Sequence, residues 1–143
     1  MSEQITITAY TDGACSGNGA RTAKAGAAAI LVARDEQGQV IRETSLKSKV
    51  EGEQTSNRAE VQAVILALES LKRSGVTITI VTDSNYVFGT MTSGWKRRRN
   101  YDLWRRLDEL VNRHHVTFEK CAGHTGHEWN EKADVLAKEA VWL

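Results

Sequence analysis

Residues 76–85 read Val-Thr-Ile-Thr-Ile-Val-Thr-Asp-Ser-Asn, and their β-branched run predicts a buried strand over residues 76–83. An extended segment at residues 5–12 ends in Thr11-Asp12, the same pair of residue types as Thr82-Asp83. A helix is predicted between the two segments, and a strand, a crossover helix and a second strand form a right-handed parallel unit. If the two strands are neighbours, Asp12 and Asp83 lie side by side at the carboxyl edge of the sheet, where open α/β sheets bind ligands.

The remaining periodicities predict a mixed α/β domain. Residues 27–33 and 40–47 alternate as strands joined in a hairpin, and residues 116–121 form a fifth strand. A helix is predicted from residue 57 to about 73, with Asn57 and Glu60 resembling a capping box at its start. Ser84 is expected to cap a short helix through Met91, and helical spacing marks two more, beginning near Tyr101 and spanning residues 130–142. The predicted order is βββαβααβα, a five-stranded mixed sheet with helices on both faces.

Length and composition indicate one globular domain spanning residues 1–143. The chain is 41% hydrophobic and 26% charged, which is typical of soluble proteins. No apolar stretch approaches the roughly 20 residues that span a bilayer, and the start lacks the features of a secretory signal, so a cytoplasmic protein is expected. The two cysteines, Cys15 and Cys121, are too few for a disulfide framework and are interpreted as reduced thiols.

The charge is small overall but unevenly distributed. The formal net charge is +1, which argues against a protein that coats nucleic acid by bulk electrostatics. Between Trp95 and His115, however, seven basic residues stand against three acidic ones. Residues 116–143 are acidic by comparison. A basic segment beside an acidic one favours a phosphate grip next to a metal site, although a solvated helix face explains the same pattern.

Four acidic residues could form a metal site. Two neighbouring carboxylates repel, so a pair such as Asp12 and Asp83 usually shares a proton or holds cations. Glu60 lies in the first turn of its predicted helix, outside the apolar stripe, and Asp134 lies among alanines that look buried. An acid in such a place needs a partner, which a metal would supply. Oxygen ligands without a cysteine or histidine cage favour Mg²⁺ or Mn²⁺ over zinc.

Four linked motifs carry a family resemblance. They are Thr11-Asp12-Gly13-Ala14-Cys15-Ser16-Gly17-Asn18, Thr55-Ser56-Asn57-Arg58-Ala59-Glu60, Thr82-Asp83-Ser84-Asn85-Tyr86-Val87, and Gly123-His124-Thr125-Gly126-His127 followed by Asn130-Glu131 and Asp134. In order and spacing they are similar to the motifs of type 1 ribonucleases H, and the similarity covers nearly the whole chain. The resemblance implies the ribonuclease H-like fold and an endonuclease that hydrolyses the RNA strand of RNA–DNA hybrids.

The resemblance also implies roles for individual residues. Asp12, Glu60, Asp83 and Asp134 correspond to the acids that bind two Mg²⁺ ions, which activate water and stabilise the leaving 3′ oxygen. His124 matches a histidine thought to assist proton transfer or product release. A set of short side chains is implied to line the minor groove of the hybrid, which exposes 2′-hydroxyls: Cys15, Asn18, Ser56, Asn57 and Asn85. The expected products carry a 5′ phosphate and a 3′ hydroxyl.

Three departures from the family pattern concern substrate affinity. Gly19 follows Gly17-Asn18 where the family commonly has proline. Glu53 replaces a basic residue that helps grip a DNA phosphate, so Thr55 is expected to act with other donors. The long basic protrusion of many bacterial members is reduced to a short segment. Trp95, Lys96, Arg97, Arg98 and Arg99 are therefore the expected substrate handle, a role for which a merely solvated loop is the alternative.

Three rival functions remain at this point. His114, His115, Cys121, His124 and His127 are close in sequence, but their spacing does not match the usual zinc-ligand patterns. A binding-only hybrid sensor would keep the fold without turnover, yet all four acids are present. A related nuclease, such as an integrase or a reverse-transcriptase domain, would share the fold. The chain is expected to act as a monomer without an obligate protein partner.

Overall fold

The computed structural model describes residues 4–121 and 128–143 and contains a five-stranded mixed sheet. Strands β1 (Thr6–Ser16), β2 (Lys24–Arg34) and β3 (Val40–Lys49) pair antiparallel as a meander. Strands β4 (Thr77–Thr82) and β5 (His115–Lys120) extend the sheet in parallel from β1, so that the strand order is β3-β2-β1-β4-β5. The predicted element order and the predicted parallel pairing of the first and fourth strands are confirmed.

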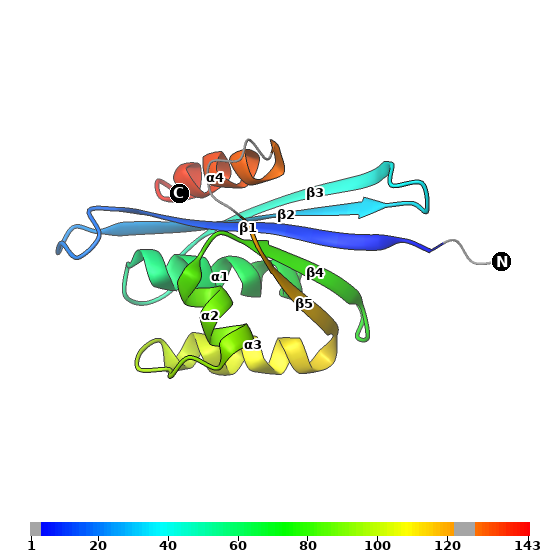
Figure 1. Cartoon of the computed structure of the whole chain (residues 1–143). Helices are drawn as coiled ribbons and strands as arrows, with labels where there is room; N and C mark the ends of the chain where they lie inside the picture. The colour runs from blue at the N-terminus through cyan, green and yellow to red at the C-terminus, as the bar shows by residue number, and fades with distance from the viewer. Residues whose placement is uncertain (1–3, 122–127) are drawn as a thin grey trace.

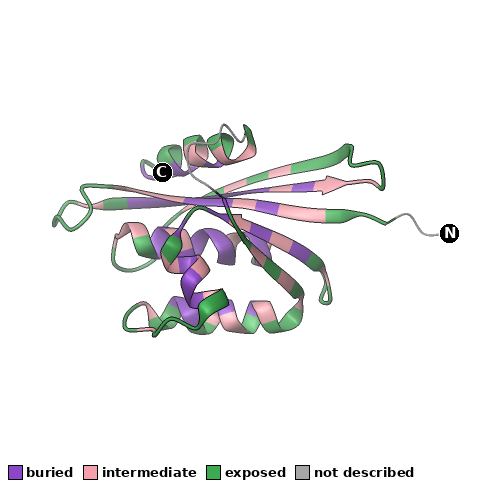
Figure 2. Cartoon of the chain, in the orientation of Figure 1, coloured by how far each residue is buried: buried purple, intermediate pink, exposed green. Residues whose placement is uncertain are grey.

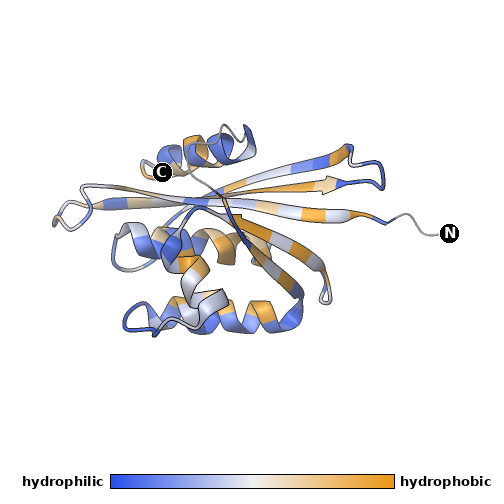
Figure 3. Ribbon diagram, viewed as in Figure 1, coloured by the Kyte–Doolittle hydropathy of each residue, from blue (hydrophilic) through white to orange (hydrophobic). Residues whose placement is uncertain are grey.

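Helices cover both faces of this sheet (Figure 1). One face carries α1 (Ser56–Glu69), α2 (Asn85–Ser93) and α3 (Tyr101–Arg113), while α4 (Glu128–Ala140) packs on the other. The main core joins β1 and β4 to the three helices and includes Ile65, Leu68, Ile80 and Trp104. Buried residues gather where α1 meets the sheet (Figure 2), and the loop between α2 and α3 is hydrophilic (Figure 3).

Several predicted boundaries were wrong. Strand β1 does not end at Asp12 but continues to Ser16, because its far half still pairs with β2 after pairing with β4 has ended at Tyr10. The cap of α1 is not Asn57: Thr55 caps the helix by accepting a hydrogen bond from the Arg58 backbone N–H at 3.1 Å. Helix α1 also ends at Glu69, earlier than residue 73. The Ser84 cap of α2 is confirmed by its 3.1 Å bond from the Val87 N–H.

Two glycines let helices approach the sheet unusually closely. A Cβ on Gly13 would lie 2.5 Å from the backbone of Ala59 and Glu60, so α1 meets β1 backbone to backbone at this point. A Cβ on Gly26 would lie 2.4 Å from the Val141 nitrogen, which shows the same close approach at the end of α4. Any larger residue would push the helices away. Gly13 therefore fixes the distance between Asp12 on β1 and Glu60 on α1.

Candidate active site

Three carboxylates from three elements converge at the edge of the sheet. The parallel pairing of β1 and β4 ends at Tyr10 and Val81, and both Asp12 and Asp83 follow two residues later. Glu60 reaches the same place from the first turns of α1. One oxygen of each of these three carboxylates lies within 4.8 Å of the others. The predicted proximity of Asp12 and Asp83 is confirmed, and Glu60 joins them instead of capping its helix.

The carboxylates of the cluster repel one another, and their burial and this repulsion raise the pKa of two of them. Asp12 is only 8% exposed, and burial together with the Asp83 charge raises its pKa to about 7. Glu60 is half-buried, and burial together with the charges of Asp12 and Asp83 raises its pKa to about 10. Without a cation, this cluster therefore retains protons near neutral pH. Asp83 is the exposed member, open to solvent and to a substrate.

Asp134 adjoins the cluster from α4. It lies outside the group of three oxygens, but its carboxyl contributes to the raised pKa of Asp12. Lys138 pairs with it at 2.9 Å one turn along the helix. The Asp134 side chain is 44% exposed, so this lysine can leave it at little cost. Asp134 is thus positioned to serve as a fourth ligand.

The residues present fit a divalent cation. Glu60 Oε1 is buried and has no hydrogen-bond partner among the described residues. A buried carboxylate oxygen without a donor is costly, and a bound cation would satisfy it. The donor set consists of carboxylate oxygens alone, which is the set that Mg²⁺ or Mn²⁺ prefers. Among residues 4–121 and 128–143 this is the one group of acidic, cysteine or histidine side chains with metal-ligand spacing.

Comparison with known proteins identifies the family. The sequence profile of RNase H matches residues 4–142. The chain belongs to the RNase H family. Ribonuclease H of Dinoroseobacter shibae is 47% identical over 93% of this chain and 89% of its own length. Ribonuclease H of Pseudomonas fluorescens is 39% identical over 99% of this chain and 94% of its own.

Solved structures of the RNase H family share the fold. RNase H1 from the halophilic archaeon Halobacterium salinarum is 30% identical with a TM-score of 0.67, over 95% of this chain and 97% of that one. LC11-RNase H1, which was isolated from compost by a metagenomic approach, has been crystallised with an RNA/DNA hybrid. It is 26% identical with a TM-score of 0.70, over 95% of this chain and 96% of its own. The predicted fold class is therefore confirmed.

Two of the predicted minor-groove residues of this RNase H chain are in contact at the start of α1, the helix that bears Glu60. Asn18 in the β1–β2 turn accepts a hydrogen bond from the Ser56 N–H at 3.2 Å, which holds the turn against the start of α1. The Cys15 thiol lies 3.6 Å from the Gln54 carbonyl, and burial raises its pKa. Asn57 and Asn85 are exposed in the first turns of α1 and α2. The structure thus joins Asn18 to Ser56, while the contacts of all five residues with substrate remain predictions.

The basic segment, defined as residues 95–99, has two side chains that contact neighbouring helices and three that are free. Trp95 packs on Gly89 of α2, where a Cβ would lie 2.3 Å from its indole ring. Arg97 pairs with Asp108 of α3 at 2.9 Å and lies 5.1 Å above the Trp104 ring. The other three cations are exposed and make no ion pair with the described part of the chain: Lys96, Arg98 and Arg99. The segment is therefore held at two points and presents three free charges.

Among the described residues, His114 has a clear structural role. His114 Nδ1 accepts a hydrogen bond from the Val76 N–H at 3.2 Å, which fixes the end of α3 beside the start of β4. Burial and neighbouring Arg113 and His115 lower its pKa, which keeps the ring neutral. His124, the predicted proton-transfer residue, lies outside the described residues, as does His127. The zinc alternative gains no support among the described residues.

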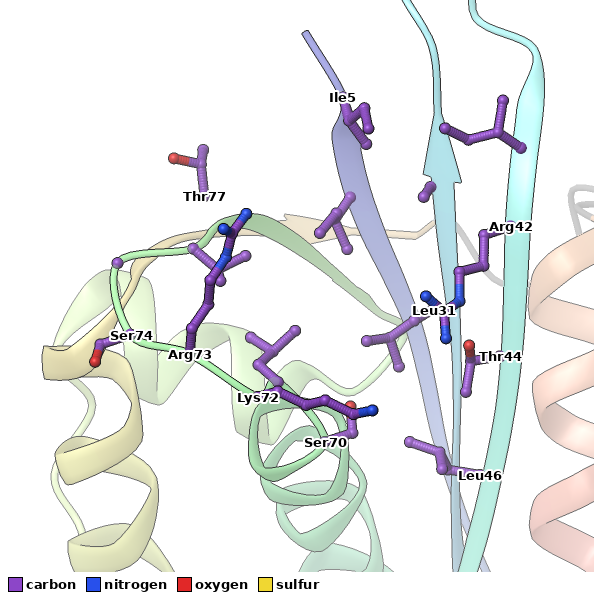
Figure 4. Close-up of a pocket in the computed structure, with 16 residues that line it drawn as sticks. Ile5, Leu31, Arg42, Thr44, Leu46, Ser70, Lys72, Arg73, Ser74 and Thr77 are labelled. Atoms are coloured by element: carbon purple, nitrogen blue, oxygen red, sulfur yellow. The ribbon is translucent and has the colours of Figure 1, made fainter. Parts of the chain in front are cut away.

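A cavity of about 1130 Å³ lies away from the acids, beyond the end of α1 (Figure 4). Its walls come from the first half of β1, the β2–β3 hairpin and the loop before β4. The lining is apolar with three cationic side chains, Arg42, Lys72 and Arg73, and includes no carboxylate. This lining does not suit a metal ion, because its three cationic side chains repel a cation and no carboxylate offsets them. No helix among the described residues has the length and apolarity required to cross a membrane.

Sequence reasoning missed the residues that support the site. Arg58 looked like a polar residue of the first helical turn, yet it is 5% exposed and bonded to the loop before α1 and to the start of α3. Asn100 and Tyr86 belong to the same network. Asn100 and Asp102 are separated from Arg58 by more than 40 residues. Only the isolated acid Asp102, within a basic stretch, hinted at a cationic partner.

Proposed function

We propose that this chain hydrolyses the RNA strand of RNA–DNA hybrids as a metal-dependent endonuclease, leaving 5′-phosphate and 3′-hydroxyl ends. The observation that carries the proposal is the cluster of Asp12, Glu60 and Asp83, with its unsatisfied buried oxygen, in a chain of the RNase H family. The hybrid bound to LC11-RNase H1 supports the choice of substrate. Residues 1–143 act in this proposal as one catalytic domain.

Each acid has a proposed part. Asp12 and Glu60 form the rigid base of the site because both are held by the close contact of α1 with β1 at Gly13. Asp83 is the exposed ligand on the substrate side, and Asp134 completes the set after separating from Lys138. When bound, two Mg²⁺ ions would supply activation of water and charge neutralisation at the scissile phosphate. Mn²⁺ is expected to replace Mg²⁺, since both take oxygen ligands.

The neighbouring side chains suit a duplex that is recognised by shape. Short polar groups beside the acids can contact 2′-hydroxyls and sugar oxygens in a wide minor groove without selecting a base sequence. We assign this role to Cys15, Asn18, Ser56, Asn57 and Asn85. Thr55 and the basic segment would contact phosphates, which orient the duplex but carry no sequence information. The protein is proposed to act in the cytoplasm as a monomer.

The activity is tested by supplying four labelled substrates to the same preparation: hybrid, duplex RNA, duplex DNA and single strands. Cleavage of the RNA strand is expected only in the hybrid, in Mg²⁺ or Mn²⁺, and excess EDTA should stop it because carboxylates alone cannot neutralise the phosphate. Equal cutting of duplex DNA, or cleavage that persists in EDTA, would contradict the proposal. Binding of hybrid without cutting would instead favour the sensor alternative.

His124→Ala is expected to reduce turnover without abolishing it. We expect a loss of about 10- to 100-fold, at or below the lower end of the roughly 10²- to 10⁴-fold contribution of general acid–base catalysis. The comparison is made at saturating hybrid, with His115→Ala as the matched control because His115 is an exposed residue at the start of β5. Turnover of His124→Ala at the wild-type rate would show that this histidine is a bystander.

A further inference from the structure

The basic segment is followed by Asn100, a residue in an unusual conformation. Asn100 has φ 61° and ψ 34°, and no other described non-glycine residue has a positive φ. It occupies the N-cap position of α3, yet its side chain makes no capping hydrogen bond. Asparagine tolerates the left-handed region better than most residues, but this conformation still needs support. The support comes from the side-chain amide, which is bonded on both sides.

Arg58 holds one side of that amide. Its Nη1 donates to Asn100 Oδ1 at 3.2 Å and to Asp102 Oδ1 at 2.9 Å, and Nη2 donates to Asp102 Oδ2 at 2.9 Å. Nε and Nη2 also donate to the Glu51 carbonyl at 3.0 and 2.7 Å. The guanidinium lowers the pKa of Asp102 to about 2, so the pair stays ionised. Arg58 therefore joins the loop before α1 to the start of α3.

Tyr86 holds the other side. Its hydroxyl accepts a hydrogen bond from Asn100 Nδ2 at 3.0 Å and another from Trp104 Nε1 at 3.1 Å. The centroids of the Tyr86 and Trp104 rings lie 5.4 Å apart. Trp104 is buried, and the guanidinium of Arg97, which belongs to the basic segment, lies over its ring. The chain of contacts thus runs from Arg58 through Asn100, Tyr86 and Trp104 to Arg97. It connects the helix that bears Glu60 with the segment that presents free cations.

We propose that Arg58, acting through Asn100 and Tyr86, is a positioning residue that sets the basic segment at a fixed place relative to the metal-binding acids. This inference rests on the proposed function, because it assigns the three free cations of the segment to phosphates of the hybrid. In this role Arg58 contacts neither the metal-binding acids nor the substrate. It lies two residues before Glu60 on α1, so one rigid helix carries both the metal ligand and the anchor.

The contact pattern favours positioning over simple stabilisation. Stability alone does not require this ion pair, since a pair whose Asp102 side chain is 66% exposed adds little net free energy. A guanidinium with five directed hydrogen bonds instead defines orientation, which lysine cannot reproduce with a single ammonium. In the proposed function the three free cations meet phosphates of the duplex, so the place of the segment decides how many of them make contact. We therefore assign the network the role of preserving the position of the basic segment relative to α1.

The experiment measures binding of a fluorescent RNA–DNA hybrid by anisotropy, in EDTA, between about 50 and 200 mM salt. Arg58→Lys keeps the net charge, so a lower salt dependence would reflect displaced cations rather than lost charge. We expect the slope of log Kd against log salt to flatten by about 1 to 2 and Kd to rise about fivefold to 20-fold at low salt. Placed in a Lys96→Ser, Arg98→Ser, Arg99→Ser background, Arg58→Lys should change the slope no further.

Tyr86→Phe provides an independent test, because it removes only the hydroxyl that accepts from Asn100 and Trp104. It should flatten the slope in the same direction even if Arg58→Lys folds poorly. Arg34→Lys is the matched control, since Arg34 also donates to a tyrosine hydroxyl, at 3.2 Å, but lies in the β2–β3 hairpin region. Its slope and Kd should equal those of the wild type.

Three outcomes would overturn the inference. An unchanged slope in folded Arg58→Lys and Tyr86→Phe, with only a lower melting temperature, would reduce the network to a stabilising role. If Arg58→Lys flattened the slope of log Kd against log salt further in the triple Ser background, Arg58 would act by a route that does not involve the free cations. Absence of salt-dependent hybrid binding by the wild-type chain would overturn both this inference and the proposed function. Binding without cleavage would contradict the proposed activity alone, because the readout needs no turnover.

Discussion

Replacing Asp12 by Asn is expected to lower turnover of hybrid by at least about 10³-fold, the scale of losing charge stabilisation at a transferring phosphoryl group. The same substitution should leave the fold intact and raise its stability. Asp12 is buried beside Asp83, and its raised pKa records the free energy needed to keep it ionised there. An amide of the same shape removes that repulsion and can still accept the Gly13 N–H bond of 2.9 Å.

Initial rates and melting temperature measured on one preparation separate the two effects. We expect Asp12→Asn to melt a few degrees higher than the wild type at neutral pH without metal, since about 1 kcal/mol corresponds to roughly 3–5 °C for a domain of this size. Asp35→Asn is the matched control, because Asp35 only organises a hairpin turn by accepting from Gln37 and Gln39. Loss of folded signal in Asp12→Asn would favour a structural role for this carboxylate.

The metal-free protein is expected to lose stability as pH rises. Glu60 has a folded-state pKa of about 10 against 4.5 for the ordinary group, and Asp12 about 7 against 3.8. Above the ordinary value, the unfolded chain releases a proton that the folded chain retains. The folded state then binds more protons than the unfolded state, so stability falls by up to about 1.4 kcal/mol per pH unit for each group.

The sign and window follow from these two groups. The contribution of Glu60 to stability is greatest below about pH 4.5. It declines as pH rises from there to the folded-state pKa of Glu60, about 10. The Asp12 contribution to stability also declines with rising pH, but only up to about pH 7. Asp102 acts oppositely but outside this window, because its pKa is lowered to about 2 and its contribution is lost only in strong acid. Between neutral pH and pH 9, Glu60 therefore dominates.

A metal ion should reverse this trend, since it binds the ionised carboxylates and displaces their protons. Melting temperatures recorded from about pH 5 to 8 should fall with pH in EDTA and fall less, or rise, in Mg²⁺. Glu60→Gln has the charge of the protonated acid and should flatten the EDTA curve. An equally steep decline in Glu60→Gln would mean that other groups cause it. Identical curves with and without Mg²⁺ would contradict metal binding at these acids.

Local sequence was sufficient for the order of elements and for two of the acids. Alternation and helical spacing are set by which side chains avoid water, so strands such as β4 and helices such as α1 are readable without a structure. The handedness of crossover connections then placed β1 beside β4. Asp12 and Asp83 therefore lie close together, as predicted. Boundaries were less certain because hydrogen bonds to other strands decide where β1 ends.

Glu60 shows where local reasoning left two roles open, a metal ligand and a capping residue. The spacing of Asn57 and Glu60 is that of a capping box, and nothing nearby in sequence excludes it. The actual cap is Thr55, which leaves the Glu60 side chain free to turn toward the sheet. The decisive contact is the close approach of α1 to β1 at Gly13, between segments more than 40 residues apart. Such a contact has no periodicity that a local pattern could report.

The sequence by itself determined the fold class, the family motifs and the residue types of the metal site, because periodicity and motif spacing are properties of the chain. Only the tertiary structure decided that Glu60 Oε1 is buried without a donor, and that the pKa of Asp12 and of Glu60 rises. It also decided which cations of the basic segment are free and that Arg58 anchors Asn100. Burial, repulsion and hydrogen bonding depend on distances in space, and these exist only after distant segments have packed together.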